Sequence, residues 1–370
     1  MIPYLDMKPV YDELKPELDA AWERVMRSGW FVLGKEVEAF EGEYAAYCGS
    51  KHCVGLGNGL EALELVLRAW DIGAGDEVIT PSNTYIATWL AITAVGATVV
   101  PVEPTPNGPN IDPDRIAAAI TPRTKAIMPV HLYGEPADMD AINALAIKHG
   151  LKVVEDVAQA QGSKVRGRRA GSLGDAGAHS FFPTKNIGAA GDGGTVTTDD
   201  AKLADRLRVL RNYGSRVRYV NLERGVNSRL DELQAAILRV KLAKLDDWND
   251  RRRKVAARYH DKLAGIPGLG LPRAPQWAEP VWHLYVVRVL DGAGRREELQ
   301  KALEKAGIGS LIHYPIPPHL QQAYADLGLK KGAYPLAEEL AAAVLSLPMG
   351  PHLPLEAVDE VAATVRKALA

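Results

Sequence analysis

Strand and helix signals alternate along the first two thirds of the chain, and this alternation constrains the fold more than any other feature. Apolar runs rich in β-branched residues predict strands at residues 76–80, 97–102, 125–130 and 152–155. Stretches with helical spacing lie between them, at residues 85–95 and 139–149. A third helix is expected to begin at Pro113, with Asp112 as its capping residue. Strands joined through helices run parallel, so the sequence predicts an α/β fold with a mainly parallel sheet flanked by helices.

The last part of the chain has a different pattern. A long amphipathic stretch dense in Lys and Arg, residues 231–263, predicts one helix that connects two domains. After it we expect a mixture of strands and helices, at residues 283–289, 295–306 and 309–313, with two further helices at the end. This mixture is typical of a smaller α+β domain. We therefore expect a large domain over residues 1–245, which includes the N-terminal segment, and a small C-terminal domain over residues 246–370.

Composition excludes several classes of protein. A chain of 370 residues that is 47% hydrophobic can form two substantial cores. Its formal net charge of −2 gives no indication of a nucleic-acid or membrane partner, and its first residues lack the basic start and apolar core of a signal peptide. Two cysteines, Cys48 and Cys53, fit a reducing compartment, and without a second Cys/His cluster they do not predict a metal site. We expect a cytoplasmic protein without a metal.

Lys185 lies in a loop of small and apolar residues that follows Ser180 and precedes a glycine-rich run. Asp156 ends the strand expected at residues 152–155. A dry environment lowers the pKa of a lysine towards the free amine that attacks an aldehyde, and a carboxylate can keep a pyridine nitrogen protonated. The pair therefore suits pyridoxal phosphate (PLP), whose aldehyde Lys185 would hold as a Schiff base. Glu155 is an alternative acid, but alternation along a strand points the two carboxylates to opposite faces.

The segments around Asp156 and Lys185 resemble the DegT/DnrJ/StrS family of PLP-dependent sugar aminotransferases. The resemblance covers the whole chain and includes residues 2–6, 28–34, 313–315 and 345–348. It implies the fold-type I aminotransferase fold, with PLP as cofactor and pyridoxamine phosphate as its form between the two half-reactions. It also implies that Lys185 is the Schiff-base lysine and later moves the proton between the substrate carbon and the cofactor. Asp156 would contact the pyridine nitrogen, and Gln159 would lie beside the ring hydroxyl.

The same resemblance assigns residues to the phosphate and the ring. Asn58, Gly59 and Leu60 would bind the phosphate, and the Ser180 hydroxyl would complete the site. Their position at an expected helix N-terminus favours an anion on physical grounds as well, and the glycine spacing does not fit the dinucleotide motif Gly-x-Gly-x-x-Gly. Tyr85 would stack on the pyridine face, although an aromatic side chain in such a position is usually part of the core.

Further residues are implied at the edge of the site. Asn227 would reach the phosphate of the neighbouring subunit, which implies a homodimer with shared active sites. From the local sequence alone, Asn227 could instead be a loop residue without a role in the site. Ser228 follows it where the family has an aromatic residue. His313 and Tyr314 are candidate sugar contacts, or else side chains packed under the proline-rich loop that follows them. His179 has no explanation from the sequence.

The resemblance implies transfer of an amino group from glutamate to a keto group of a nucleotide-linked deoxysugar. Relatives that act on 4-ketosugars typically have Thr-Thr-Gly-Glu-Gly-Gly after the lysine and a histidine after the Ser-Phe pair. Here Asp192 replaces the glutamate and Phe182 the histidine. The shorter acid and the lost polar group favour the branch that aminates a dTDP-linked 3-keto-6-deoxyhexose to a 3-amino sugar.

Three other functions are weighed against this one. A 4-ketosugar aminotransferase of the same family and a non-catalytic PLP-binding regulatory protein remain open, although the combination of Lys185, Asp156 and Gln159 argues against the latter. In dehydratase relatives a histidine replaces the lysine, so Lys185 argues against that activity.

Overall fold

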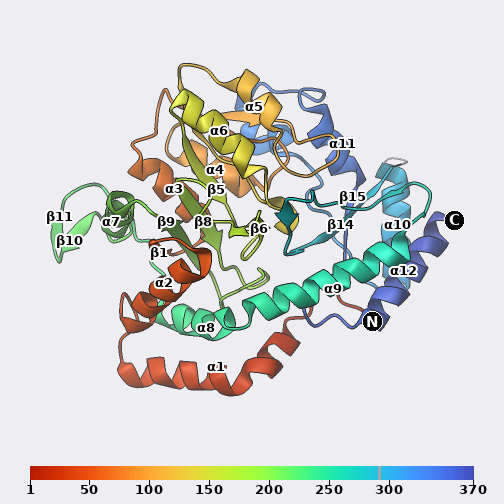
Figure 1. Cartoon of the computed structure of the whole chain (residues 1–370), viewed down its shortest axis with the longest axis horizontal. Helices are drawn as coiled ribbons and strands as arrows, with labels where there is room; N and C mark the ends of the chain where they lie inside the picture. The colour runs from red at the N-terminus through yellow and green to blue at the C-terminus, as the bar shows by residue number, and fades with distance from the viewer. Residues whose placement is uncertain (291–292) are drawn as a thin grey trace.

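A seven-stranded sheet forms the centre of the larger part of the molecule (Figure 1). The computed structural model describes residues 1–290 and 293–370. Five neighbouring strands run parallel, and the remaining two, β9 and β1, pair antiparallel at one edge. The strand order is β1 (His52–Leu56), β9 (Gly194–Thr198), β8 (Ala176–Ser180), β5 (Lys152–Asp156), β4 (Thr124–Ile127), β2 (Glu77–Pro81) and β3 (Thr98–Val102). The predicted α/β class with a mainly parallel sheet is confirmed.

Helices cover both faces of this sheet because successive strand residues are apolar and point to opposite sides. In β2, Val78 belongs to the core under α3 (Gly59–Ala69), α4 (Ile86–Ala94) and α7 (Ala201–Leu210). The next residue, Ile79, belongs to the core under α5 (Pro113–Ala119) and α6 (Met139–His149). Asp112 caps α5 as expected, because its side chain accepts a hydrogen bond from the N–H of Asp114 at 3.0 Å.

The stretch predicted as one helix over residues 231–263 is two helices, α8 (Glu232–Leu242) and α9 (Leu245–Leu263). No proline or glycine marks the break at residues 243–244. Two acidic residues in the first turn of α9 favour a new N-terminus there, and Leu245 turns into the core that it shares with Leu238 of α8. α1 (Lys8–Ser28) and α2 (Lys35–Cys48) pack on α8.

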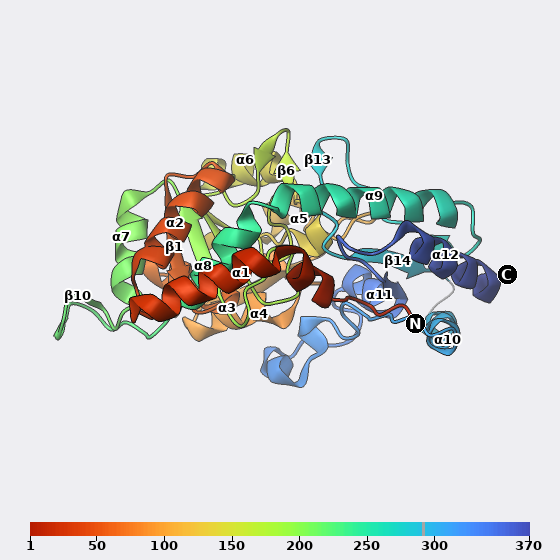
Figure 2. The same cartoon turned by 90° about the horizontal axis from the view of Figure 1, so that it is seen from below.

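A second core lies around the three-stranded sheet β12 (Leu269–Gly270), β14 (Tyr285–Val289) and β15 (Val344–Leu347). α9, α10 (Ala293–Lys305) and α12 (Leu355–Leu369) cover it. Ile2 packs in the same core and bridges Ile308, so both chain ends lie at this part of the molecule (Figures 1 and 2). The strand expected at residues 309–313 is a single bridge between Leu311 and Ser346. The division into domains at residues 245 and 246 remains a proposal.

A two-stranded hairpin projects from the body of the molecule beside α7 (Figure 2). Short elements make up the rest: η1 (Leu132–Gly134), β6 (Lys164–Val165), β7 (Arg168–Arg169), the hairpin strands β10 (Ser215–Val217) and β11 (Val220–Asn221), β13 (Ala278–Glu279), η2 (Pro318–Leu320), η3 (Gln322–Leu327) and α11 (Pro335–Ala343). Within residues 1–290 and 293–370, none of the helices has the length and apolar character needed to cross a bilayer.

Candidate active site

Lys185 lies in the loop that leaves the end of β8. Its backbone N–H donates to the carbonyl of Phe182 at 2.9 Å, and Phe181 beneath it is fully buried. Burial lowers the pKa of the Lys185 amine to about 8, and the nearby carboxylate of Asp156 opposes this shift. Lys241 of α8 donates to the carbonyl of Gly188 at 2.5 Å and so holds the far end of the loop.

Asp156 is the last residue of β5, and two donors fix its carboxylate. The hydroxyl of Thr88 donates to Oδ2 at 3.0 Å, and the N–H of Ala158 donates to Oδ1 at 3.1 Å. Burial raises the pKa of this carboxyl above its usual value. Both donors and the positive charge of Lys185 lower the pKa, but they do not cancel the effect of burial. A buried carboxylate is stabilised by a cationic N–H partner, so this side chain is suited to a protonated pyridine nitrogen.

Glu155 points to the opposite side of β5, as the alternation along the strand predicts. Its carboxylate accepts from the N–H groups of Gly171, Leu173 and Gly174 at 2.7–2.9 Å and bonds to Nε2 of His131 at 2.9 Å. Burial raises the pKa of Glu155, but His131 and the backbone donors bring it below its usual value. Glu155 therefore holds a loop in place and is not the acid of the site.

Gln159 connects the large sheet with the loop that carries the candidate sugar contacts. Its Oε1 accepts from the N–H of Tyr133 at 2.7 Å, and its Nε2 donates to the hydroxyl of Tyr314 at 3.0 Å. The Tyr314 ring lies 5.2 Å from that of Tyr85, which is 54% exposed. The structure thus brings Gln159, Tyr85 and Tyr314 together.

His313 lies next to this group and is fixed on two sides. Its Nδ1 bonds to the hydroxyl of Ser346 at 2.8 Å, and its carbonyl accepts from the hydroxyl of Tyr133. Burial lowers the pKa of His313 to about 4, with a further contribution from Lys185. His313 is therefore a neutral side chain near Lys185 at physiological pH.

The N-terminus of α3 faces the start of the Lys185 loop. Asn58 caps the helix, since its Oδ1 accepts from the N–H of Glu61 at 2.9 Å. Among the residues that the structure describes, the N–H groups of Gly59 and Leu60 donate no recorded hydrogen bond. A Cβ added at Gly59 would lie 2.6 Å from Cβ of Ser180, so only glycine allows this close approach. Free N–H groups at a helix N-terminus are suited to a phosphate.

Asn227 lies in the segment before α8. It is exposed, and its side chain makes no recorded hydrogen bond to the described part of the chain. The next residue, Ser228, is buried; it accepts from the N–H of Gly57 at 3.0 Å and donates to Glu61. Ser228 thus anchors the segment before α3, which explains a hydroxyl at this position.

His179, which the sequence left unexplained, is a buried structural residue. Its Nδ1 bonds to the hydroxyl of Tyr44 at 3.0 Å and its Nε2 to that of Thr197 at 2.9 Å. Burial lowers its pKa to about 3, so the ring is neutral. The histidine links α2 to β8 and β9 without entering the site.

Sequence reasoning missed three residues that position the site: Thr88, Tyr133 and Asn186. Asn186 follows Lys185; it donates to Oδ1 of Asn249 in α9 at 2.8 Å and bonds to Nδ1 of His283 at 3.0 Å. No local pattern marks these residues, because each acts on a partner that is distant in the sequence. Asn186 alone could have been suspected, from its place beside the lysine.

The side chains present fit PLP. A lysine with a lowered pKa and a buried carboxylate lie close enough to affect each other's pKa. Unbonded N–H groups lie at the α3 N-terminus, where glycine leaves room. Lys185, Asp156, Gln159 and the start of α3 would hold the cofactor, which supplies a carbonyl for the amine and an electron sink in its ring.

The model of the DegT/DnrJ/EryC1/StrS aminotransferase family matches residues 12–366, and the chain belongs to this family. Members of this family depend on PLP. One similar solved structure is the PLP form of the putative sugar aminotransferase Spr1654 from Streptococcus pneumoniae, with a TM-score of 0.90 at 29% identity. The match covers 95% of this chain and 96% of that one. The structure of S. venezuelae DesV in complex with a ketimine intermediate has a TM-score of 0.96 at 54% identity, covering 99% and 98% of the two chains. The predicted family, cofactor and fold are confirmed.

Three curated relatives are similar over nearly their whole length. The chain is 56% identical to the erythromycin biosynthesis sensory transduction protein EryC1 of Saccharopolyspora erythraea, over 99% of both chains. It is 55% identical to dTDP-3-amino-3,4,6-trideoxy-alpha-D-glucose transaminase of Streptomyces venezuelae, over 95% of this chain and 92% of the relative. It is 53% identical to dTDP-3-amino-3,6-dideoxy-alpha-D-galactopyranose transaminase of Aneurinibacillus thermoaerophilus, over 99% of both.

Proposed function

We propose that this PLP-dependent sugar aminotransferase transfers an amino group from glutamate to the keto group of a dTDP-linked 3-keto-6-deoxyhexose and so forms a 3-amino sugar. The observation that carries the proposal is similarity over nearly the full length, at 55% and 53% identity, to two transaminases named for dTDP-3-amino sugars. The two relatives differ in the configuration and oxygenation of their sugars, so the assignment is to the 3-keto class.

The residues of the site have complementary roles in this reaction. Bound PLP supplies the electron sink that makes the substrate C–H bond acidic. The Lys185 amine, with its pKa lowered to about 8, takes that proton and returns it. Asp156, held by Thr88, keeps a positive charge on the ring nitrogen. The unbonded N–H groups of Gly59 and Leu60 hold the phosphate.

Tyr85, Gln159, Tyr314 and His313 form the remaining part of the proposed site. The 54% exposed ring of Tyr85 is free to stack on the pyridine face. Gln159 orients the Tyr314 hydroxyl at 3.0 Å and so places it towards the substrate side. A neutral His313 near Lys185 can accept or donate a hydrogen bond to a sugar hydroxyl without adding charge.

We also propose that the active enzyme is a homodimer to which each chain contributes an Asn227. Exposed apolar side chains lie on two separate segments, Trp30 and Phe31 after α1, and Tyr219 and Leu222 on the projecting hairpin. Surfaces of this kind are typical of protein interfaces. Asn227, exposed and without a recorded partner in the described chain, lies before α8 and is free to reach a second subunit.

The decisive experiment supplies purified holoenzyme with glutamate and a dTDP-linked 3-keto-6-deoxyhexose and determines the product by NMR. Nitrogen at C3, with little turnover of the 4-keto isomer, is the expected result. Nitrogen at C4 with the 3-keto substrate untouched would reverse the regiochemistry.

A regulatory role is the second candidate, because the relative at 56% identity is named a sensory transduction protein. Glutamate alone separates the two functions: an aminotransferase converts bound PLP to pyridoxamine phosphate, which moves its absorption from the visible to the near ultraviolet. A spectrum that glutamate leaves unchanged, in a protein with bound PLP, would favour the regulatory role.

A further inference from the structure

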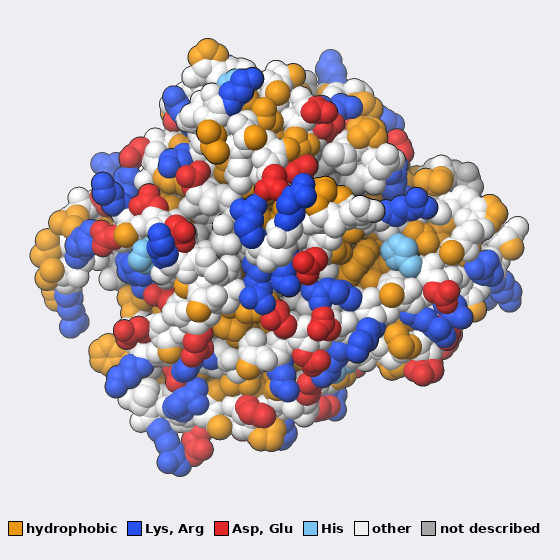
Figure 3. Space-filling view, in the orientation of Figure 1, with side chains coloured by type: hydrophobic (Ala, Val, Ile, Leu, Met, Phe, Trp, Pro, Cys, Tyr) orange, Lys and Arg blue, Asp and Glu red, His pale blue; other side chains and the backbone are white. Residues whose placement is uncertain are grey.

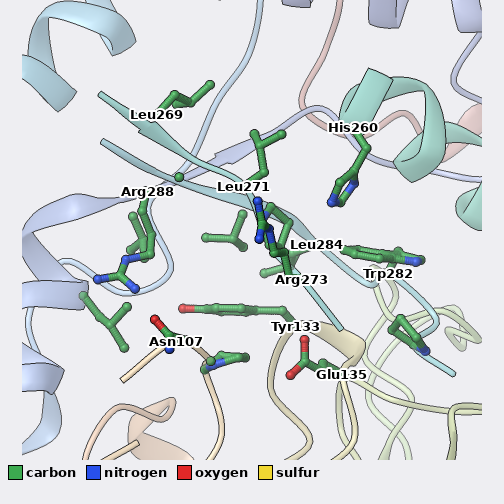
Figure 4. A pocket seen from close by; sticks show the side chains of 18 of the residues that line it. Asn107, Tyr133, Glu135, His260, Leu269, Leu271, Arg273, Trp282, Leu284 and Arg288 are labelled. Atoms are coloured by element: carbon green, nitrogen blue, oxygen red, sulfur yellow. The ribbon is translucent and has the colours of Figure 1, made fainter. Parts of the chain in front are cut away.

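A cavity of about 880 Å³ lies beside the loops that follow β3 and β4, and Lys185 is not among its lining residues (Figure 4). Residues 106–109, Tyr133 and Glu135 form one wall, and residues 264–265 and 269–273 with side chains of β14 form the other. Lys185 lines a different and much smaller cavity together with Lys241 and Arg252. The volume is in the range of about 300–1,000 Å³ that is usual for small-molecule sites.

Tyr133, Leu340 and Val344 line both this cavity and the narrow space around His313 and Tyr314. The backbone at Tyr133 is left-handed, with a φ of 62°, and so is that of Trp282 in the opposite wall, with a φ of 49°. Large side chains rarely adopt this conformation, and where they do the surrounding structure imposes it. The Tyr133 ring is held by the hydrogen bond from its hydroxyl to the carbonyl of His313, and the Trp282 ring packs against those of His260 and Tyr285.

About half of the lining surface is apolar. Figure 4 shows Leu271 and Leu284 near the centre, with the flat rings of Tyr133 and Trp282 on adjoining sides. On the face drawn in Figure 3, an orange hollow beside a pale-blue histidine lies over this part of the molecule. Two aromatic rings with leucines between them suit a flat apolar molecule.

The polar groups of the lining are mainly hydrogen-bond donors. Arg288 is already engaged, because its terminal nitrogens bond to the carbonyl of Pro106 and to Glu339 and its Nε is buried away from the cavity. The guanidinium of Arg273 is exposed, makes no recorded ion pair with a described residue, and points into the space in Figure 4.

Glu135 adds a third polar group at this wall. Its carboxyl has no recorded hydrogen bond within residues 1–290 and 293–370. Burial raises its pKa to about 8, so the group is mostly protonated at neutral pH and adds a donor instead of a negative charge. The guanidinium of Arg273, beside a neutral acid, favours an anionic group on the ligand.

We propose that this cavity is a second binding site, distinct from the one at Lys185, for a small flat aromatic anion. Its ring system would lie against Tyr133 and Trp282, and its acidic group would face Arg273. The inference does not depend on which sugar the enzyme aminates.

The test uses the holoenzyme and the fluorescent probe 8-anilinonaphthalene-1-sulfonate, which has a flat apolar body and one negative charge. We expect saturable binding at one site per chain. Leu271→Trp, which fills the space, should weaken binding about tenfold or more. Arg273→Ala should weaken it about threefold, as expected for the loss of one partly solvated charge contact. The neutral analogue N-phenyl-1-naphthylamine should bind more weakly and should not respond to Arg273→Ala.

Ile147→Ser on α6 is the matched control, because Ile147 is 82% exposed and lies outside both the cavity lining and the proposed dimer surface. Unchanged circular dichroism and an unchanged visible PLP band establish that each variant is folded. Equal affinity in wild type, Leu271→Trp and Arg273→Ala would overturn the proposal. Loss of binding in Ile147→Ser, with the cavity variants unaffected, would also overturn it, because the probe would then bind exposed apolar side chains outside the cavity. If Leu271→Trp does not fold, the exposed Arg273→Ala and the neutral probe decide the question.

Discussion

Replacing Thr88 by valine tests the role of Asp156 without touching a residue that contacts the cofactor. The Thr88 hydroxyl donates to Oδ2 of Asp156 at 3.0 Å, and both side chains are buried. A hydrogen bond to a charged group contributes about 1.5–3 kcal/mol. Thr88→Val leaves the carboxylate with one recorded donor, the N–H of Ala158 at 3.1 Å. We therefore expect kcat to fall by about 10- to 100-fold, since each 1.4 kcal/mol corresponds to about a factor of ten.

The variant also has a pH signature. Burial already raises the pKa of Asp156, and loss of a donor to the charged form raises it further. Asp156 must be ionised to support the ring charge, so activity falls as the pH falls through its pKa. The acid limb of the kcat profile should therefore shift to higher pH in Thr88→Val, which steady-state assays across a pH series would measure.

Two controls separate this effect from a packing defect. Thr88→Ser keeps the hydroxyl and should restore most of the activity and the wild-type acid limb. Thr93→Val removes a hydroxyl from the same helix that bonds to Tyr324 and to backbone carbonyls instead, and should leave the profile unchanged. A Thr88→Val enzyme with wild-type kcat and an unshifted acid limb would refute the assigned role.

Three further outcomes are expected. Lys185→Ala should fold, lose turnover and the visible PLP band, and still bind pyridoxamine phosphate; retention of band and activity would show that the lysine is misassigned. Mixing Lys185→Ala with an inactive Asn227→Ala variant should restore some activity in hybrid dimers, whereas a fully active monomer on a sizing column would contradict shared sites. His179→Ala should lower the free energy of unfolding by about 2–4 kcal/mol in urea titrations, since two buried hydrogen bonds and ring volume are lost. The exposed His149→Ala should change it by less than about 0.5 kcal/mol.

The elements of the large sheet could be predicted because each depends on local periodicity. The helix expected at residues 139–149 is α6, and the strands expected around it are present within one to three residues at their ends. The two departures have tertiary causes. The break between α8 and α9 lets Leu245 join a core built by α2 and α8, and the segment at 309–313 makes only one bridge to β15. Neither cause leaves a pattern in the sequence.

The residues of the candidate site also fall into those that local sequence indicates and those that depend on the folded structure. Lys185 and Asp156 follow recognisable strand and loop segments, so the sequence indicates both. Thr88 acts on a carboxylate 68 residues away, and Tyr133 bonds to a carbonyl 180 residues away. Such pairs exist only after the chain has folded, which is why sequence reasoning found the reacting groups and not the residues that orient them.

The turn at Tyr133 and Gly134 connects Gln159, the loop of His313 and the segment before β14. The N–H of Tyr133 donates to Gln159, its hydroxyl donates to the carbonyl of His313, and its carbonyl accepts from the N–H of Leu284 at 3.2 Å. Gly134, with a φ of 96°, lies so close to the segment before β14 that an added Cβ would be 2.7 Å from the backbone nitrogen of His283. Only glycine allows both this conformation and this approach. One turn therefore sets the positions of the segment before β14, Gln159 and His313 together, so a change that moves one is expected to move the others.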